Sequence, residues 1–354
     1  MGDPRIHCRV RGGPTQGWGN VYRLASVAEQ VQARLGGSIT FLAEGPPTVR
    51  GYLARRGFEV VALAEDLPLD AEARVLAGLE APDLTLVEML DVTLERQAVL
   101  AARGGALAVF DDLCDHVYDA DLVVCGQDLP SFANRALSAP RTRFLVGYDY
   151  FLARPEFVAR RATPAVVGAR IETVLVTLGG GKYDVGYLKA AAALDDFETR
   201  VGHGVRATFV LGHAAEAELG AELKSRRPGS VVLGGVSDLD RLMAEHDLVI
   251  ASAGYTKLEA ALVGRPQVML AAQWHQIPLA QTFAARTGVP NLGYLAYAEP
   301  DQIAAALLAL DPEAARRSQI DAARAVVDGR GMQRVVDALA ELVKGDGTCR
   351  VGVA

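Results

Sequence analysis

The sequence predicts an α/β protein built from two doubly wound domains, each a parallel sheet with helices on both faces. Three observations lead to this prediction. Short apolar segments alternate with stretches of helical periodicity along the whole chain. The first apolar segment of each half runs into a glycine-rich loop, at 12–19 and at 179–181. At 354 residues, the chain is also longer than one hydrophobic core usually organises.

Six strands are predicted in the first half of the chain. They span 6–10, 39–43, 60–63, 84–87, 106–110 and 122–125, and helical stretches separate them. The clearest helix follows the first strand, where Val21, Leu24, Ala28, Val31 and Leu35 recur at helical spacing. This strand, glycine loop and helix form the first βα unit.

The pattern restarts after Pro164, with predicted strands at 173–178, 207–211, 230–233, 247–251 and 267–272. The arginine-rich segment 148–164, with two prolines, is the predicted linker. We therefore expect domains at 1–155 and 165–331. A C-terminal helix is expected at 332–345, because one apolar stripe runs along it. The stripe consists of Met332, Val335, Val336, Leu339 and Leu342.

Charge and composition narrow the class of protein. The 36 lysines and arginines are outnumbered by 43 acidic residues, and the formal net charge of −7 argues against a nucleic-acid partner. The N-terminus is nevertheless locally basic, at Arg9, Arg11 and Arg23. No apolar run approaches the roughly 20 residues of a membrane span.

Cysteine and histidine usage indicates a reducing compartment and no metal site. Cys8, Cys114, Cys125 and Cys349 lack the paired spacing of disulfide or zinc sites, and the N-terminus lacks the apolar segment of a secretory signal. The six histidines are scattered. We therefore expect a cytoplasmic protein that binds no metal, and the oligomeric state is left open.

The strongest functional signal lies between residues 251 and 280. Ser252, Gly254, Tyr255 and Thr256 close an apolar strand and open a helix, whose first N–H groups lack partners and attract phosphate. One turn later, Glu259 is placed to accept hydrogen bonds from a ribose diol. This pattern is typical of a nucleotide-sugar site, although a capped helix with an exposed glutamate would share it.

Two further polar or glycine-rich segments follow strands of the second half. Gln273 and Gln276 are placed to bind sugar hydroxyls, although any exposed loop would look similar. Gly179 and Gly180 permit close approach of the backbone to a ligand. Ligands of parallel sheets bind beyond the carboxyl ends of the strands, where all of these residues fall.

The first half offers its own site residues. Gly17 and Gly19 do not keep the spacing of a dinucleotide fingerprint, so their loop is either a tight turn or a ligand loop. Asn20 is either a helix cap or a substrate contact.

Acidic residues and an imidazole follow the strand 106–110. Asp111, Asp112 and His116 lie where a general base would be needed, or they cap the next element.

Taken in order, these segments resemble the GT-B superfamily. Within it, they resemble the family of UDP-2,4-diacetamido-2,4,6-trideoxy-β-L-altropyranose hydrolases and spore coat polysaccharide glycosyltransferase-like proteins. The segments that carry the resemblance are GWGNVYRLASVAEQV, FDDLCDHVYDADLVV, YFLARPEF, VLVTLGGG, SAGYTKLEAALVGRPQVML and DGRGMQRVV. They are spread over nearly the whole chain.

The resemblance implies two Rossmann-like domains that face a cleft, with UDP held by the second and the sugar or acceptor facing the first. Gly179 and Gly180 would then lie near the nucleotide and Glu259 on the ribose. Ser252, Gly254 and Thr256 would bind the diphosphate.

One position departs from the family pattern. The loop histidine that acts as acid and base in the hydrolase falls on Asn20, and an amide does not shuttle protons. The base would instead be Asp111, Asp112 or His116, or the sugar would be transferred to an acceptor whose chemistry needs a different partner. Asn20 stays a candidate site residue, and hydrolysis by an Asn20→His variant would show that this position controls the choice between water and another acceptor.

We therefore expect a glycosyltransferase with a UDP-sugar donor and a small-molecule or glycan acceptor. It would use no metal and no cofactor, because the N-terminus of a helix stabilises the leaving UDP. The alternatives are a UDP-sugar hydrolase of pseudaminic-acid-type amino-deoxysugar synthesis and a non-catalytic nucleotide-sugar-binding protein.

Overall fold

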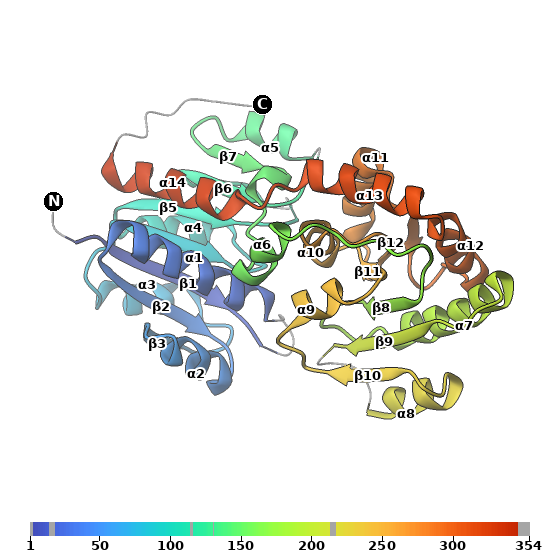
Figure 1. The fold of residues 1–354 in the computed structure, drawn as a ribbon. Coiled ribbons are helices and arrows are strands. Elements are labelled where there is room, and N and C mark those ends of the chain that lie inside the picture. Colours follow the sequence, from blue (N-terminus) through green and yellow to red (C-terminus); the bar gives the residue numbers. More distant parts are fainter. Residues whose placement is uncertain (1–2, 14–17, 114–115, 130, 213–216, 346–354) are drawn as a thin grey trace. The chain divides into compact units, whose positions relative to one another are not determined.

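In the computed structural model, the chain forms two parallel sheets, each covered by helices (Figure 1). The structure describes residues 3–13, 18–113, 116–129, 131–212 and 217–345. The chain divides into two compact units. Unit 1 comprises Met1–Leu152 with Arg330–Ala354, and unit 2 comprises Ala153–Gly329. The prediction of an α/β protein with two doubly wound parallel sheets is confirmed.

Seven parallel strands make the sheet of unit 1, in the order β3-β2-β1-β4-β5-β6-β7. They are β1 (Arg5–Arg11), β2 (Ser38–Glu44), β3 (Glu59–Leu63), β4 (Leu84–Glu88), β5 (Ala106–Phe110), β6 (Leu122–Cys125) and β7 (Arg143–Val146). The chain moves outward from β1 to one edge and then returns to β4 on the other side of β1. The carboxyl ends of β1 and β4 therefore flank a topological switch point, where sheets of this kind bind ligands.

Helices on both faces bury this sheet. They are α1 (Gly19–Leu35), α2 (Pro47–Arg55), α3 (Leu69–Ala77), α4 (Leu94–Ala101), α5 (Ser131–Ser138) and α14 (Gly331–Lys344), with the short 3-10 helix η1 (Tyr148–Tyr150). The predicted apolar stripe of α14 is present, and its Val335 and Leu339 share one core with Val21 and Leu24 of α1. In Figure 1, α14 (red) accordingly lies beside α1 (blue), although three hundred positions separate them in the sequence.

Unit 2 repeats the arrangement with six parallel strands, in the order β10-β9-β8-β11-β12-β13. They are β8 (Thr173–Thr177), β9 (Arg206–Leu211), β10 (Val231–Gly234), β11 (Leu248–Ser252), β12 (Gln267–Ala271) and β13 (Asn291–Tyr294). The switch point of this sheet lies between β8 and β11.

The helices of unit 2 lie on both faces of its sheet. They are α6 (Pro155–Arg161), α7 (Asp184–Val201), α8 (Ala217–Arg226), α9 (Leu239–Ala244), α10 (Thr256–Val263), α11 (Gln276–Thr287), α12 (Pro300–Leu310) and α13 (Glu313–Val326). Tyr187, Phe197 and Leu307 are among the buried side chains of the hydrophobic core that involves α7, α12 and the sheet.

The elements that were not predicted from the sequence include β7, β13 and α6. The edge strands β7 and β13 have four residues each, and their side chains are mostly only half-buried. Helix α6 occupies part of the segment expected to be a linker. Its Pro155 stands in the first turn, where a missing N–H breaks no hydrogen bond, and its Phe157 is buried.

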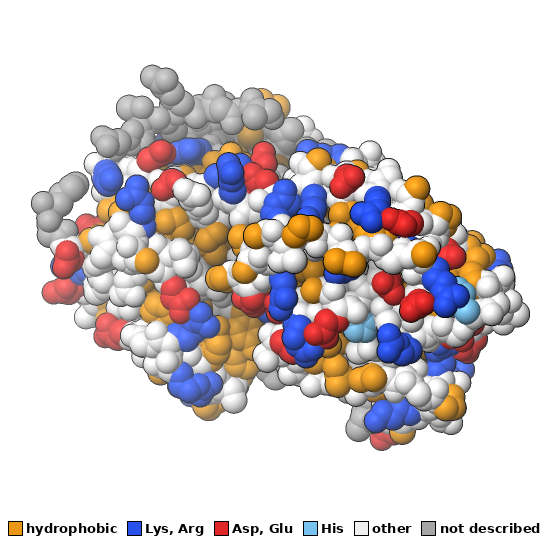
Figure 2. Space-filling model, viewed as in Figure 1, with side chains coloured by type: hydrophobic (Ala, Val, Ile, Leu, Met, Phe, Trp, Pro, Cys, Tyr) orange, Lys and Arg blue, Asp and Glu red, His pale blue; other side chains and the backbone are white. Residues whose placement is uncertain are grey.

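The surface carries both signs of charge side by side. On the face that Figure 2 shows, basic and acidic side chains are interspersed. Ion pairs one helical turn apart also occur on the surface, such as Arg200 with Asp196 and Arg226 with Glu222. Within the described ranges, no helix has both the length and the apolar character needed to cross a membrane.

Candidate functional site

The predicted phosphate-binding segment of unit 2 lies where β11 ends and α10 begins. Ser252 is the last residue of β11 and Thr256 the first of α10, and both are buried. The Ser252 hydroxyl donates to Thr256 Oγ1 over 3.2 Å. Tyr255 holds the N-cap position, and its side chain caps no N–H group. The Tyr255 side chain therefore does not compete with a ligand for the N–H groups at the start of α10.

A glycine loop after β8 lies against this segment. Gly179 has a φ of +94°, and a Cβ there would stand 3.6 Å from Ser252 Oγ. Gly180 is exposed, and a Cβ added to it would meet no other atom within 4 Å. Gly212, directly after β9, was missed by the sequence reasoning. A Cβ on it would lie 2.5 Å from the Gly179 carbonyl oxygen, so only glycine lets the two loops pack together.

The predicted glutamines lie beside the same segment, but each is already engaged. Gln276 begins α11, and its Oε1 accepts a hydrogen bond from the Ala272 N–H over 2.9 Å. Its Nε2 lies toward Gly254, 3.2 Å from where a Cβ on that glycine would be. Gln273 donates to the Tyr183 hydroxyl over 2.8 Å. Gln276 thus has one structural role, while its amide nitrogen faces the phosphate-binding segment.

Glu259 is held by an arginine. Its Oε1 accepts from Arg154 Nε and Nη2, at 3.3 and 3.1 Å. Burial raises the pKa of the Glu259 carboxyl, and the Arg154 guanidinium opposes that rise. Arg154 also lies over the Phe157 ring at 4.5 Å from its centroid. The glutamate is therefore fixed in orientation by α6 and the residue before it, a partnership that the sequence reasoning did not predict.

The structure thus brings Gly179, Ser252, Gly254, Thr256 and Gln276 together, and we call these five residues the cradle. It lies at the carboxyl ends of β8 and β11, at the switch point of the unit 2 sheet. Backbone N–H groups, hydroxyls and one amide face it, and these groups suit a diphosphate.

In unit 1, the sequence-predicted acids have different environments. Asp111 is buried and accepts hydrogen bonds from the Tyr118 hydroxyl at 2.6 Å and the Leu113 N–H at 2.8 Å. Asp112 is half-buried, and its Oδ2 accepts from Arg23 Nη1 at 2.6 Å. Asp112 therefore remains the more accessible carboxylate for chemistry, while Asp111 braces the loop after β5.

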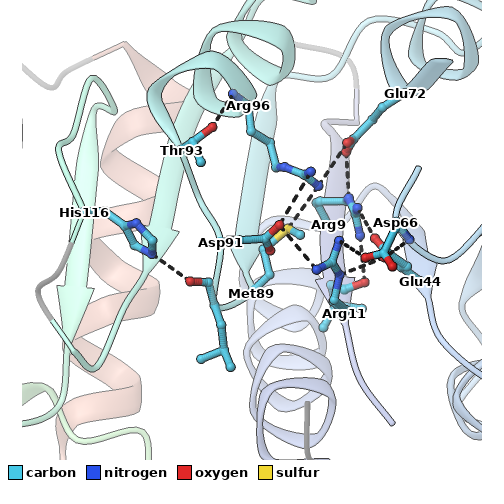
Figure 3. Close-up of polar contacts among 12 residues, drawn as sticks. Arg9, Arg11, Glu44, Asp66, Glu72, Met89, Asp91, Thr93, Arg96 and His116 are labelled. Carbon is cyan, nitrogen blue, oxygen red and sulfur yellow. Dashed lines mark hydrogen bonds and ion pairs between the residues drawn. The ribbon is translucent and has the colours of Figure 1, made fainter. Parts of the chain in front are cut away.

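His116 contacts the loop after β4. Its Nε2 is 3.0 Å from the Leu90 carbonyl oxygen, a contact that Figure 3 draws as a dashed line. The imidazole thus ties the segment after β5 to the loop after β4.

The start of α1 differs from one of the two expectations for Asn20. The helix begins at Gly19 with Trp18 at the N-cap, and the Trp18 side chain does not cap the helix. Asn20 is thus the second helical residue and not the cap, and it is half-exposed. A Cβ on Gly19 would have nothing within 4 Å, so packing does not require glycine there. Gly17 lies outside the described residues.

A buried glutamate that the sequence reasoning missed joins this group. Glu88 ends β4 and is 1 % exposed, and its Oε1 accepts from Arg23 Nε over 2.6 Å. Arg23 therefore bridges two carboxylates, those of Glu88 and Asp112. Burial raises the pKa of Glu88 to about 8, and the Asp112 charge adds to the rise while Arg23 opposes it. The sequence signal for Glu88 was its position at the end of a predicted central strand.

Glu88 should make folding stability depend on pH. Between its ordinary pKa of 4.5 and about 8, only the folded state holds the proton. Stability should therefore fall by about 1.4 kcal/mol per pH unit as pH rises through this window. Urea denaturation of the natural chain and of Glu88→Gln from pH 5 to 8 checks this. The stability difference between the two chains should change with pH, and a constant difference would contradict the expectation.

A second set of charges lies at the carboxyl ends of β1 and β2, and we call it the arginine cluster (Figure 3). It consists of Arg9, Arg11, Glu44, Glu72, Asp91 and Arg96. Arg9 is fully buried and donates to Glu44 over 2.6 Å and to Glu72 over 2.7 Å. Arg11 reaches Glu44 at 2.8 Å. The positive charges expected near the N-terminus, at Arg9 and Arg11, are thus neutralised by acidic residues of unit 1.

Comparisons with known proteins show which proteins are similar to this chain in sequence and in fold. No family model matches the chain. The spore coat polysaccharide biosynthesis protein SpsG of Bacillus subtilis is 24 % identical over 337 residues, which cover 94 % of this chain and 96 % of SpsG. The crystal structure of Acinetobacter baumannii MurG superimposes with a TM-score of 0.66 at 14 % identity, covering 96 % of this chain and 99 % of MurG.

A third similar protein is Anabaena Alr3699/HepE, whose structure was solved in complex with UDP and glucose. It gives a TM-score of 0.61 at 16 % identity and covers 95 % of this chain and 99 % of its own. The chain has the GT-B fold. The fold that the resemblance implies is therefore confirmed, and the chain is similar to SpsG over nearly its whole length.

Within the GT-B fold, the two groups of site residues belong to different units. The cradle lies in unit 2, and the Asp112, Arg23 and Glu88 group lies in unit 1. Across the described residues, no three His, Cys, Asp or Glu side chains gather in a way that could hold a metal ion.

Proposed function

We propose that the protein is a glycosyltransferase that takes a sugar from a UDP-sugar donor and transfers it to a small-molecule or glycan acceptor. The observation that carries this proposal is the cradle, where the Gly179 loop and the start of α10 meet at the switch point. The similarity to SpsG over nearly the whole chain and the GT-B fold support it.

The donor would be bound by groups of unit 2. N–H groups at the start of α10 and the hydroxyls of Ser252 and Thr256 bind the diphosphate, and Gly179 and Gly180 lie by the nucleotide. Glu259 accepts hydrogen bonds from the ribose diol. When UDP departs, the positive end of the α10 dipole stabilises its growing negative charge, and no metal ion is required for this step.

Asp112 would act as the general base for the acceptor. The acceptor hydroxyl oxygen forms a bond to the anomeric carbon while the bond from that carbon to the UDP oxygen breaks. UDP keeps the electron pair of the broken bond, and the hydroxyl proton passes to the Asp112 carboxylate. Arg23 orients that carboxylate through its hydrogen bond to Oδ2. Asn20, one turn before Arg23 on α1, contributes no proton transfer.

The proposal is tested by measuring UDP release from a panel of UDP-sugars, with and without cell-extract glycans as acceptors. We expect release from the preferred donor to depend on an acceptor. Equal release in water alone would instead establish a UDP-sugar hydrolase. Tight donor binding with no release under any condition would establish a non-catalytic binding protein.

A further inference from the structure

A buried lysine lies directly behind the cradle. Lys257 is the second residue of α10 and is 0 % exposed. Its Nζ donates to the Ala253 carbonyl over 2.8 Å and to the Gly254 carbonyl over 2.9 Å. The side chain thus folds back toward the N-terminus of its helix, as helical side chains generally do.

The surroundings hold this lysine in place on several sides. Its ammonium stands 5.8 Å from the centroid of the Phe283 ring of α11, which adds a cation–π contact. Its own carbonyl accepts from Gln267 Nε2 over 2.9 Å, and the Gln267 N–H donates to Gln319 Oε1 over 2.6 Å. The start of α10 is therefore tied to β12 and α13.

Burying a charged ammonium group completely at this position costs free energy. Removing the charge of a lysine from water costs several kcal/mol or more, so lysine is almost never fully buried unless other groups compensate it. A methionine would fill a similar volume without that cost. The hydrogen bonds to the carbonyls of Ala253 and Gly254 offset part of it, and they direct the charge at the backbone of the cradle.

The two carbonyls that Lys257 contacts belong to the peptide groups of the cradle. The Ala253 carbonyl shares a peptide group with the Gly254 N–H, and the Gly254 carbonyl shares one with the Tyr255 N–H. In a trans peptide, the carbonyl and the N–H point in opposite directions. A hydrogen bond donated to the carbonyl also polarises the N–H of the same group, which makes it a stronger donor.

We propose that Lys257 is a positioning residue for the diphosphate of the donor: it fixes and polarises the peptide groups at Gly254 and Tyr255 from behind, so that their N–H groups bind phosphate. This inference rests on the proposed function. Lys257 does not touch the ligand and acts through the backbone. Its charge is buried, so solvent and salt screen its field at the cradle only weakly. The buried Lys257 ammonium thereby provides a positive charge near the leaving group.

The inference is tested by calorimetry of the full chain with two probes, UDP and uridine. Lys257→Met keeps the volume of the side chain but removes both its charge and its hydrogen bonds. We expect about 10- to 100-fold weaker binding of UDP, from the loss of charge-assisted hydrogen bonding, and unchanged binding of uridine. Lys257→Arg, which keeps a charged donor, should restore most of the affinity for UDP.

A matched variant separates this role from a general loss of the site. Glu259→Ala should weaken UDP and uridine equally, because both carry the ribose. If Lys257→Met also weakens both equally, or weakens neither, the positioning role is overturned. Should the methionine variant not fold, Lys257→Gln, which donates hydrogen bonds without a charge, supports the same comparison.

The failure of this inference is distinguishable from failure of the proposed function. A natural chain that binds neither UDP nor uridine overturns both. A natural chain that binds UDP, combined with a folded methionine variant of equal UDP affinity, overturns only the role of Lys257.

Discussion

Replacing Arg9 with methionine is expected to lower the free energy of unfolding of unit 1 by about 3–5 kcal/mol, because Glu44 and Glu72 then stay buried with their main cationic partner removed. All three side chains are nearly inaccessible to water, so solvent does not replace the lost guanidinium. The large effect comes from leaving each buried carboxylate with one arginine, Arg11 for Glu44 and Arg96 for Glu72, and it does not measure the net contribution of the intact arginine cluster.

The two tryptophans allow this effect to be assigned to one unit. Trp18 packs against the core of unit 1, whereas Trp274 lies in unit 2. In a Trp274→Phe background, tryptophan fluorescence during urea denaturation reports on unit 1 alone. Arg34→Met is the control, because Arg34 and its partner Asp337 are each about half exposed. That change should cost at most about 1 kcal/mol. Similar losses in both variants would refute the expectation.

Replacing Asp112 with asparagine is expected to lower kcat of the acceptor-dependent reaction by about 10²- to 10⁴-fold, the usual contribution of a general base. The amide keeps the shape of the side chain and can still accept a hydrogen bond from Arg23, but it does not take a proton. The KM for the donor should stay unchanged, because the donor groups belong to unit 2. Steady-state kinetics at saturating acceptor measure both constants.

A neighbouring aspartate provides the control for this substitution. Asp119 pairs with Arg141 at 3.0 Å, and both side chains are largely exposed. Asp119→Asn should therefore leave kcat within about twofold, as surface pairs contribute little. A retained kcat in Asp112→Asn would remove Asp112 as the base and leave Glu88 and Asp111 to be examined in its place.

Most of the fold could be predicted because its strands are central and buried. Strands β5 and β6 have the predicted bounds, and the other predicted strands lie within one or two residues of the observed ones. Strand β13 escaped prediction because Asn291 and Gly293 interrupt its short apolar sequence, and both residue types are depleted in strands. Strand β7 also escaped prediction, although the edge strands β3 and β10 are equally exposed and were predicted. Helix α6 was not predicted, because a proline such as Pro155 is compatible both with a linker and with the first turn of a helix.

The site was harder to predict, because long-range pairing is invisible in a single sequence. The cradle could be predicted, since Ser252, Gly254 and Thr256 are neighbours in the chain. The Glu259 partner Arg154 lies over a hundred positions away, and the Arg23 bridge to Glu88 spans sixty-five. Gly212 and Lys257 contact backbone atoms of the Gly179 loop and of the segment before α10, respectively. No sequence motif indicates these contacts.

The return of α14 to unit 1 has a consequence for how the protein is made. The core beneath α1 includes Val335 and Leu339, and Gly331 lies so close to the Phe151 backbone that a side chain there would strike it. The ribosome therefore releases the whole of the uninterrupted second unit before it releases the piece that completes the first. Although nascent domains generally fold in order from the N-terminus, here unit 1 stays incompletely closed until residues 331–344 have been translated.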